Sequence, residues 1–314
     1  MRLVRLGPEG PLGLREPAVT VGNFDGVHRG HQALVERVVA RARRSGGTAV
    51  VLTFDPHPAR VLAPDSAPGA LTTPAQKQEL LASLGADLVV VLPFSPAVAA
   101  QSPEQFVSRV LAASLGARQV VVGESFRFGR GQSGDAARLL ALGAAGGFGV
   151  EAVPPVLDGG QPVSSSRVRE ALAGGDVATA QRLLGRAFFV DARVVRGDGR
   201  GRTIGVPTAN LESSNEVLPA RGVYAARCRV PDGSWRMAVV NRGRRPTFGG
   251  EAETVEAHLL DFDSDLYAGT VRLAFAARLR EERRFAGVQE LVAQIRDDVS
   301  RARALLSSAG AERL

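Results

Sequence analysis

The sequence predicts an α/β domain with a parallel sheet, followed by a small antiparallel β-barrel domain with a C-terminal helix. Three observations lead to this fold class. Short β-branched runs alternate with helical stretches from residue 18 to about residue 185, and strand patterns separated by turn residues follow from residue 188. One long helical pattern then covers residues 288–306. The length of 314 residues also suits two domains, because one domain typically takes roughly 100–200 residues.

The first half has a repeating order of strand, helix and strand. Near-continuous apolar strands of this kind are typical of a parallel sheet that is covered by helices on both faces. Ligands of such sheets bind at the carboxyl ends of the strands. We expect strands at residues 18–22, 48–54, 87–92 and 118–123, and helices at residues 30–46, 74–85 and 102–116.

The second half reads as antiparallel β structure. Its strand spacing and turn density favour a small barrel over an open sheet, although periodicity alone leaves closure open. The change of pattern places the domain boundary between residues 174 and 186, so we expect domains at residues 1–185 and 186–314. The expected strands are residues 188–195, 222–230, 235–241, 254–262 and 270–279.

Composition excludes several classes of protein. Cys228 is the only cysteine and the first residues contain no unbroken apolar segment, so we expect a reducing, cytoplasmic location. No apolar run approaches the roughly 20 residues that span a bilayer, so we expect no membrane partner. The net charge of +7 comes without an arginine block interleaved with aromatic residues, so we expect no nucleic-acid partner. The sequence leaves the oligomeric state open.

The first expected strand leads into a turn, GNFDGVHRGH (residues 22–31), that carries glycines and two histidines. Glycines let the backbone approach a ligand closely, and the free amides at a helix start attract phosphate. His28 and His31 are spaced to project to the same side of a first helical turn, so both rings can donate to one phosphate while charge builds on it. The turn indicates phosphate transfer. The alternative is two incidental surface histidines, and a zinc site would need more ligands.

This turn resembles the nucleotidyltransferase signature of the bacterial bifunctional riboflavin kinase/FAD synthetase family. Three further blocks agree with it in order, at residues 53–58 (TFDPHP), 122–129 (VGESFRFG) and 163–169 (VSSSRVR). The resemblance implies a nucleotidyltransferase-type, Rossmann-like domain. It also implies adenylyl transfer, in which the FMN phosphate attacks the α-phosphorus of ATP and pyrophosphate leaves without a covalent enzyme intermediate.

The resemblance assigns His28 and His31 as catalytic residues of this domain. Alternatives remain for some of the residues in these blocks. Ser164 to Ser166 could be only a helix N-cap, Phe128 could be an ordinary core residue, and His57 could be a turn residue. The residues implied for ATP are Gly22, Phe24, Asp25, Gly26, His28, Gly30, His31, Ser164, Ser165, Ser166 and Arg169, and those implied for the flavin are Phe54, Pro56, Ser125 and Phe128.

Two residues depart from the family pattern in this half. Ser125 stands where the family usually has Asn or Asp, and Ser166 stands where it usually has Thr. A serine is shorter, so a contact to the nucleotide is lost or bridged by water. This departure motivates a second hypothesis, in which the chain keeps a kinase activity and has a weakened adenylyltransferase.

The segment GDGRGRTIGVPTANL (residues 197–211) offers backbone amides for phosphates and two neutral oxygens for Mg²⁺. It resembles the riboflavin kinase signature. The resemblance implies that Thr208 and Asn210 bind Mg²⁺-ATP, and that Glu256 is the general base for the ribityl 5′-hydroxyl. Without the motif, Glu256 would read as a solvent-facing strand residue. Further residues implied for ATP are Gly199, Gly201, Gly205 and Pro207, and Arg296 and Asp298 are expected to reach the flavin.

Two further residues depart from the family pattern in the second half. Arg242 follows Asn241, where the family has an apolar residue, and Ala268 stands where the family has Gly. We expect both positions to lie in loops, and alanine would be excluded at position 268 if the backbone there required a positive φ.

The leading hypothesis is therefore a two-site enzyme. It converts riboflavin and ATP to FMN and ADP, and then FMN and ATP to FAD and pyrophosphate. A third hypothesis, a flavin- or nucleic-acid-binding module without turnover, would be favoured by binding with a steep dependence on salt and no consumption of ATP.

Overall fold

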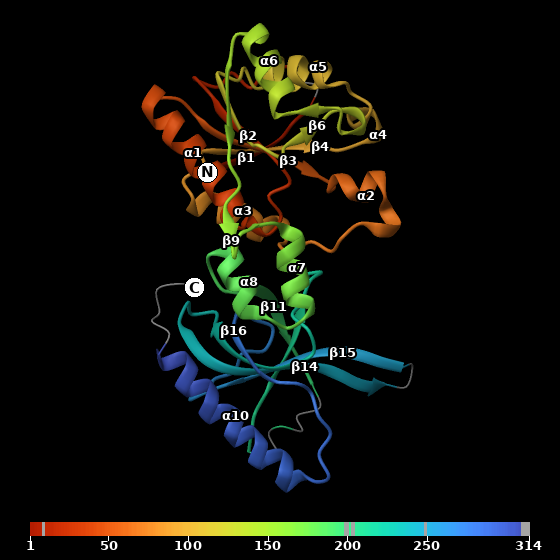
Figure 1. The fold of residues 1–314 in the computed structure, drawn as a ribbon. Coiled ribbons are helices and arrows are strands. Elements are labelled where there is room, and N and C mark those ends of the chain that lie inside the picture. Colours follow the sequence, from red (N-terminus) through yellow and green to blue (C-terminus); the bar gives the residue numbers. More distant parts are fainter. Residues whose placement is uncertain (8–9, 198–200, 202–204, 248–249, 309–314) are drawn as a thin grey trace. The chain divides into compact units, whose positions relative to one another are not determined.

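The computed structural model describes residues 1–7, 10–197, 201, 205–247 and 250–308. They form two compact units, Met1–Ser164 and Ser165–Leu314 (Figure 1). The second unit begins with two helices, α7 (Ser165–Ala173) and α8 (Val177–Leu184), which precede the barrel strands. The division by compactness thus falls before these helices, whereas the predicted domain boundary falls after them. Within the described residues, no helix is both long and apolar enough to cross a membrane.

The first unit is built on a six-stranded sheet in the order β1-β4-β3-β2-β5-β8, and every neighbouring pair is parallel. The predicted parallel sheet is therefore confirmed. The strand β1 was not predicted, because its four residues lie at an edge and three of them are exposed. The strands are β1 (Arg2–Arg5), β2 (Ala18–Val21), β3 (Ala49–Asp55), β4 (Leu88–Pro93), β5 (Gln119–Gly123) and β8 (Gly149–Val153).

Helices cover both faces of this sheet. On one face, Val35 of α1 (Arg29–Ser45) and Leu81 of α3 (Pro74–Ser83) pack against Val51. On the other face lie the apolar side chains of α5 (Pro103–Phe106), the π-helical segment η3 (Val107–Ser114) and α6 (Ala136–Gly146). Burial on both faces explains why the strand sequences are almost uniformly apolar.

The strand order places β2 at a switch point. The chain runs from β2 outward through β3 and β4, and then returns to the other side of β2 to form β5. Connections at the carboxyl ends of β2 and β5 therefore diverge, which opens the crevice where ligands of such sheets bind. The shorter elements of this unit are η1 (Asp25–Val27), α2 (Pro58–Leu62), η2 (Pro64–Ser66), α4 (Pro96–Ala99), β6 (Arg127–Phe128), η4 (Arg130–Gln132), β7 (Gly134–Asp135), β9 (Leu157–Asp158) and β10 (Gln161–Pro162).

The second unit contains a closed six-stranded barrel in the order β11-β12-β15-β14-β13-β16. The predicted barrel is confirmed, and the structure settles its closure. Tyr224 and Phe275 pack edge to face, with ring centroids 5.5 Å apart, and both are almost completely buried. The barrel strands are β11 (Phe188–Val195), β12 (Ala209–Ser213), β13 (Gly222–Arg229), β14 (Trp235–Thr247), β15 (Gly250–Leu259) and β16 (Thr270–Arg280).

The closing helix α10 (Val288–Ser308) packs on this barrel. Ala302 and Leu306 are buried against Val223, Ala225 and Leu279. The helix therefore covers one outer face of β13 and β16, as its apolar stripe predicts.

Candidate active sites

The turn between β2 and α1 has an unusual backbone. Phe24 and Val27 adopt positive φ angles of 48° and 42°, and Gly26 has a φ of 78°. A non-glycine residue in this region is uncommon, so the surrounding structure must hold the turn in place. The turn lies at the carboxyl end of β2, at the switch point of the sheet, where the sequence predicts a phosphate site.

Three predicted ATP residues of this turn are anchored inside the unit. The Asp25 carboxylate is 3% exposed and accepts hydrogen bonds from the backbone N–H of Leu71, at 3.0 and 3.1 Å, and of Thr72, at 3.3 Å. The Gly26 N–H donates to Thr72 Oγ1. Phe24 is fully buried in the core beneath the turn. Asp25 and Phe24 thus shape the turn, and their contact with ATP stays a prediction.

The two histidines are brought together as predicted. Their rings stack with centroids 3.6 Å apart and planes 16° apart. His28 is the N-cap of α1, and its Nδ1 accepts a hydrogen bond from the His31 backbone N–H at 3.3 Å. An Nδ1 that accepts carries no proton, so the neutral ring holds its proton on Nε2. The cap therefore places the His28 Nε2–H, a hydrogen-bond donor, at the start of a helix.

His31 is held in the neutral form. Burial, the neighbouring His28 and the Lys77 charge lower the pKa of His31 well below its usual value of 6.5. Its ring also lies 5.1 Å from the Phe24 ring, and among the described residues its buried Nδ1 has no hydrogen-bond partner. A neutral imidazole can donate one hydrogen bond to a phosphate without first losing a proton.

Gly30 lets the histidine pair approach the backbone. A Cβ at this position would lie 3.1 Å from His28 Cε1 and 3.6 Å from the Val163 carbonyl oxygen. Val163 directly precedes the predicted serines. Ser164 ends the first unit, whereas Ser165, Ser166 and Arg169 lie in α7 of the second unit. The contact of these four residues with ATP stays a prediction, as does that of Gly22.

The predicted flavin residues lie in different surroundings. Phe54, half-buried at the end of β3, meets Phe94 edge-on with centroids 5.7 Å apart. Pro56 and Ser125 are exposed. Phe128 is 7% exposed and belongs to the apolar core, which is the alternative weighed for it. The flavin contacts of these four residues stay predictions.

Sequence reasoning missed a second aromatic ring beside Phe128. Phe126 is half-buried and stacks on Phe128 with centroids 5.4 Å apart and planes 14° apart. Its position two residues earlier in the same motif was the available signal. His57 caps α2, since its Nδ1 accepts from the Ala59 N–H at 3.1 Å. This contact supports the reading of His57 as a turn residue.

In the second unit, the pairing of strands brings the predicted kinase residues into one row. Asn210 of β12 lies directly opposite Glu256 of β15, and Glu256 lies opposite Asn241 of β14. Residues paired in this way project from the same face of a sheet. The predicted base therefore stands between two carboxamide side chains, one of which, Asn241, had no predicted role.

Gly197 and Gly201 pack closely against Asn210 and Thr208. A Cβ on Gly197 would lie 2.0 Å from Asn210 Nδ2, and a Cβ on Gly201 would lie 3.1 Å from Thr208 Oγ1. The Val206 N–H donates to the Gly201 carbonyl at 2.8 Å, which closes the loop. Gly205 has a positive φ of 76°. Gly199 lies outside the described residues.

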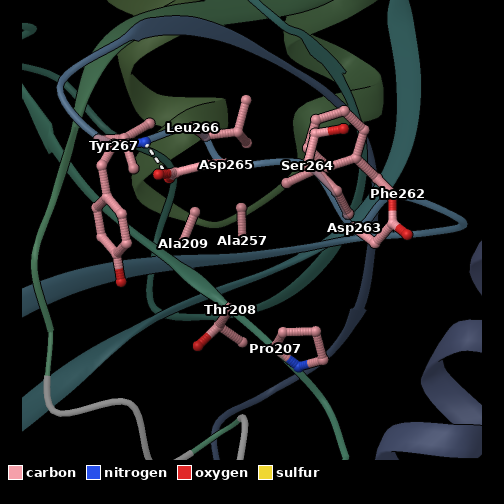
Figure 2. A pocket seen from close by; sticks show the side chains of 12 residues that line it. Pro207, Thr208, Ala209, Ala257, Phe262, Asp263, Ser264, Asp265, Leu266 and Tyr267 are labelled. Atoms are coloured by element: carbon pink, nitrogen blue, oxygen red, sulfur yellow. Dashed lines mark hydrogen bonds between the residues drawn. The ribbon is translucent and has the colours of Figure 1, made fainter.

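A pocket of about 660 Å³ opens beside this loop. Ala209 and Ala257 project toward the segment of residues 262–267 in Figure 2, which forms the opposite wall. Successive side chains of a strand alternate, so Asn210 and Glu256 face away from this pocket. The other lining residues include Pro207, Thr208 and Asp265 to Tyr267, and the last three carried no predicted role.

His258 supports the loop that precedes β12. Its Nδ1 lies 2.7 Å from the Pro207 carbonyl oxygen, and because a carbonyl only accepts, the ring donates. His258 thus has a structural contact with the loop.

The structure does not bring Arg296 and Asp298 together. Asp298 is 1% exposed and its carboxylate accepts from Arg280, with Nη2 and Oδ2 2.8 Å apart, and from Gln294. Arg296 is exposed. Two residues apart on a helix, these side chains point to different sides. Asp298 anchors α10 to β16, and the flavin contact of both residues stays a prediction.

The oxygen donors beside β12 suit Mg²⁺. This ion prefers oxygen ligands, keeps several waters, and is commonly bound by one or two carboxylates together with substrate phosphates. Thr208, Asn210 and Glu256 supply a hydroxyl, a carboxamide and a carboxylate. Within the described residues there is no group of three or more His, Cys, Asp or Glu that could hold a metal by itself. The residues present therefore fit an ion that arrives with a nucleotide.

The structure shows the surroundings of Arg242 and Ala268, the two residues of the second half that depart from the family pattern. Arg242 lies in β14, not in the loop that was expected, and its guanidinium donates to the Pro219 carbonyl and pairs with Glu253 at 2.9 Å. Ala268 does lie in a loop, with a positive φ of 60°. The chain thus places alanine in the backbone region that favours glycine.

Comparison with known proteins gives the family. A family model described as FAD synthetase matches residues 13–167, and one described as riboflavin kinase matches residues 184–306. The bifunctional riboflavin kinase/FMN adenylyltransferase of Escherichia coli (strain K12) is 40% identical over 285 residues, covering 91% of each chain. The protein of the same name from Pseudomonas fluorescens is 41% identical over 287 residues, covering 91% of this chain and 92% of its own.

A solved structure agrees with this assignment of the fold. The crystal structure of a protein described as a macrolide-efflux protein from Streptococcus pneumoniae superposes with a TM-score of 0.87 at 30% identity. The match covers 96% of this chain and 98% of that chain. The word efflux describes that protein and is not carried over to this chain. On the two matched models and the full-length relatives, the chain belongs to the bifunctional riboflavin kinase/FMN adenylyltransferase family.

Proposed function

We propose that this chain catalyses both reactions named for its relatives, with adenylylation of FMN at the turn after β2 and phosphorylation of riboflavin at the row formed by β12 and β15. The observation that carries the proposal is the stacked His28–His31 pair at the switch point of a parallel sheet. A helix start whose N-cap histidine holds its proton on Nε2 is suited to bind phosphate. The second unit holds a separate set of oxygens for the second nucleotide.

In the adenylylation step, an oxygen of the FMN phosphate attacks the α-phosphorus of ATP. The bond from that phosphorus to the bridging oxygen breaks, and pyrophosphate leaves. The His28 Nε2–H and the first amides of α1 stabilise the negative charge that builds on the phosphate oxygens. His31, neutral and stacked beneath His28, fixes the orientation of that ring.

In the kinase step, Glu256 takes the proton from the ribityl 5′-hydroxyl of riboflavin. The oxygen then attacks the γ-phosphorus of ATP, and ADP leaves. The pocket walled by residues 262–267 receives the nucleoside part of ATP, and Thr208, which lines this pocket, contacts the phosphates. Mg²⁺ held by the oxygens of Thr208 and Asn210 would neutralise phosphate charge.

The proposal also assigns partners and location. Riboflavin, FMN, FAD and ATP are the ligands, and the reactions take place in the cytoplasm. Nucleic acid has no part in either step, and neither step requires a fixed oligomeric state.

Purified protein incubated with riboflavin and Mg²⁺-ATP tests the proposal, with flavins separated by chromatography. We expect FMN to form first and FAD to follow, with pyrophosphate released in step with FAD. FMN without FAD would favour the hypothesis of a weakened adenylyltransferase that Ser125 and Ser166 motivate. The proposal fails if neither FMN nor FAD forms.

A further inference from the structure

Lys77, the only lysine of the chain, extends from α3 to the turn between β2 and α1. Its Nζ donates a hydrogen bond to the Asn23 carbonyl oxygen at 2.9 Å. The Thr53 hydroxyl of β3 donates to the same oxygen at 3.2 Å. Two donors from two different elements therefore fix the direction of one carbonyl in the turn.

This carbonyl sets the direction of the next amide. The peptide between Asn23 and Phe24 is trans, so its N–H points opposite to its C=O. The Phe24 N–H therefore points away from Lys77 and Thr53. Within the part of the chain that the structure describes, it makes no hydrogen bond. An amide left without a partner beside a helix start is a ready donor for an anion.

The backbone of the turn needs the two hydrogen bonds to the Asn23 carbonyl to keep one peptide orientation. Phe24 has a φ of 48°, and glycines stand two residues before it and two residues after it, so the backbone near it permits other peptide orientations. Asp25 and Gly26 are tied to the segment of residues 71–72, which fixes the later part of the turn. Only the contacts to the Asn23 carbonyl fix the earlier peptide among the described residues.

Two carboxylates act on the charge of Lys77. The carboxylates of Asp25 and Asp55 both act on the ammonium group, which is half-buried. Burial lowers the pKa of Lys77, and these two carboxylates oppose that shift. The ammonium donates to Asn23 and adds positive potential near the histidine pair.

We propose that Lys77 is a positioning residue for adenylyl transfer, which holds the Asn23–Phe24 peptide so that the Phe24 N–H donates to the phosphate that His28 contacts. The inference rests on the proposed function of the first unit. It predicts that the lysine acts on the chemical step through its hydrogen bond to the Asn23 carbonyl.

The test compares Lys77→Met, Lys77→Arg and Thr53→Val in steady-state assays of both reactions. Loss of one fixed donor to a developing charge costs about 10²–10³ in kcat, and misalignment costs less. We expect Lys77→Met to lower kcat for adenylylation about tenfold to a hundredfold, with the KM for FMN changed by less than about twofold. Lys77→Arg should recover most of this loss, because arginine can also donate to the carbonyl. Thr53→Val, which keeps Lys77, should lower kcat by a smaller factor.

Two controls make the outcome decisive. Arg44→Met removes an exposed cation from α1 of the same unit and should leave both reactions unchanged. The kinase activity of each variant reports the second unit, and hydrogen exchange of the β3 and β5 amides reports the fold of the first. An unchanged kcat in Lys77→Met, or a loss that neither arginine restores nor Thr53→Val reproduces, would overturn the inference. Absence of FAD formation in the unmodified protein would instead reject adenylylation in the first unit, which is the part of the proposed function on which this inference rests.

Discussion

The rings of His28 and His31 at the start of α1 have different local environments. The His31 N–H donates to His28 Nδ1, which leaves the proton of a neutral His28 on Nε2. Burial, the neighbouring His28 and the Lys77 charge lower the pKa of His31. We therefore expect the His31 ring to stay neutral near neutral pH.

The lowered pKa of His31 predicts how the stability of the first unit depends on pH. In the unfolded chain, His31 takes up a proton as the pH falls through about 6.5, whereas the folded unit resists protonation until a lower pH is reached. The free energy of unfolding should therefore fall as the pH drops below about 6.5 and level off below the folded pKa. One proton gives a slope of at most about 1.4 kcal/mol per pH unit.

Hydrogen exchange of the β3 and β5 amides between pH 5 and pH 8 would measure this dependence, after correction for the intrinsic exchange rate at each pH. His31→Gln, which cannot titrate in this range, should show a smaller loss of stability than the unmodified chain. Equal slopes in the two proteins would contradict the neutral assignment of His31.

At the scale of elements, the sequence patterns predicted the order of helices and strands in each unit but not how the strands pair. The glycine-histidine turn and the strand that precedes it follow from local pattern. The register of Asn210, Glu256 and Asn241 depends on contacts between distant strands, so Asn241 could not be identified. Phe128 shows the same limit, because an aromatic residue in a motif does not reveal which side of its strand is buried.

The loop between β15 and β16 supplies a prediction about stability. Ala268 has a φ of 60°, a region that costs an L-residue roughly 1–2 kcal/mol. Ala268→Gly should relieve this cost, partly offset by the greater entropy of glycine in the unfolded chain. We expect a net stabilisation of the barrel of about 0.5–1 kcal/mol.

Denaturant unfolding monitored by the fluorescence of Trp235, which lies in β14, would report the barrel. The matched control is Ala293→Gly, the same chemical change at an exposed position of α10, which should destabilise by about 1 kcal/mol. If both glycine variants destabilise the barrel, the positive φ of Ala268 carries no strain.

At the scale of the whole molecule, the chain contains two compact units, and each holds one of the two proposed sites. The fold of both units could be predicted because strand-helix alternation and antiparallel strand spacing leave different patterns in sequence. The division between units could not, since α7 and α8 carry ordinary helical patterns that suit either neighbour. In the proposed function, the product of the second unit is the substrate of the first.

The central claim is that each reaction has its own site, and paired variants test it most directly. His28→Ala and Glu256→Ala are each assayed for FMN formation from riboflavin and, separately, for FAD formation from added FMN. We predict that His28→Ala lowers FAD formation by about 10²-fold or more and leaves FMN formation intact, while Glu256→Ala does the reverse. Equal loss of both activities in either variant would contradict the account.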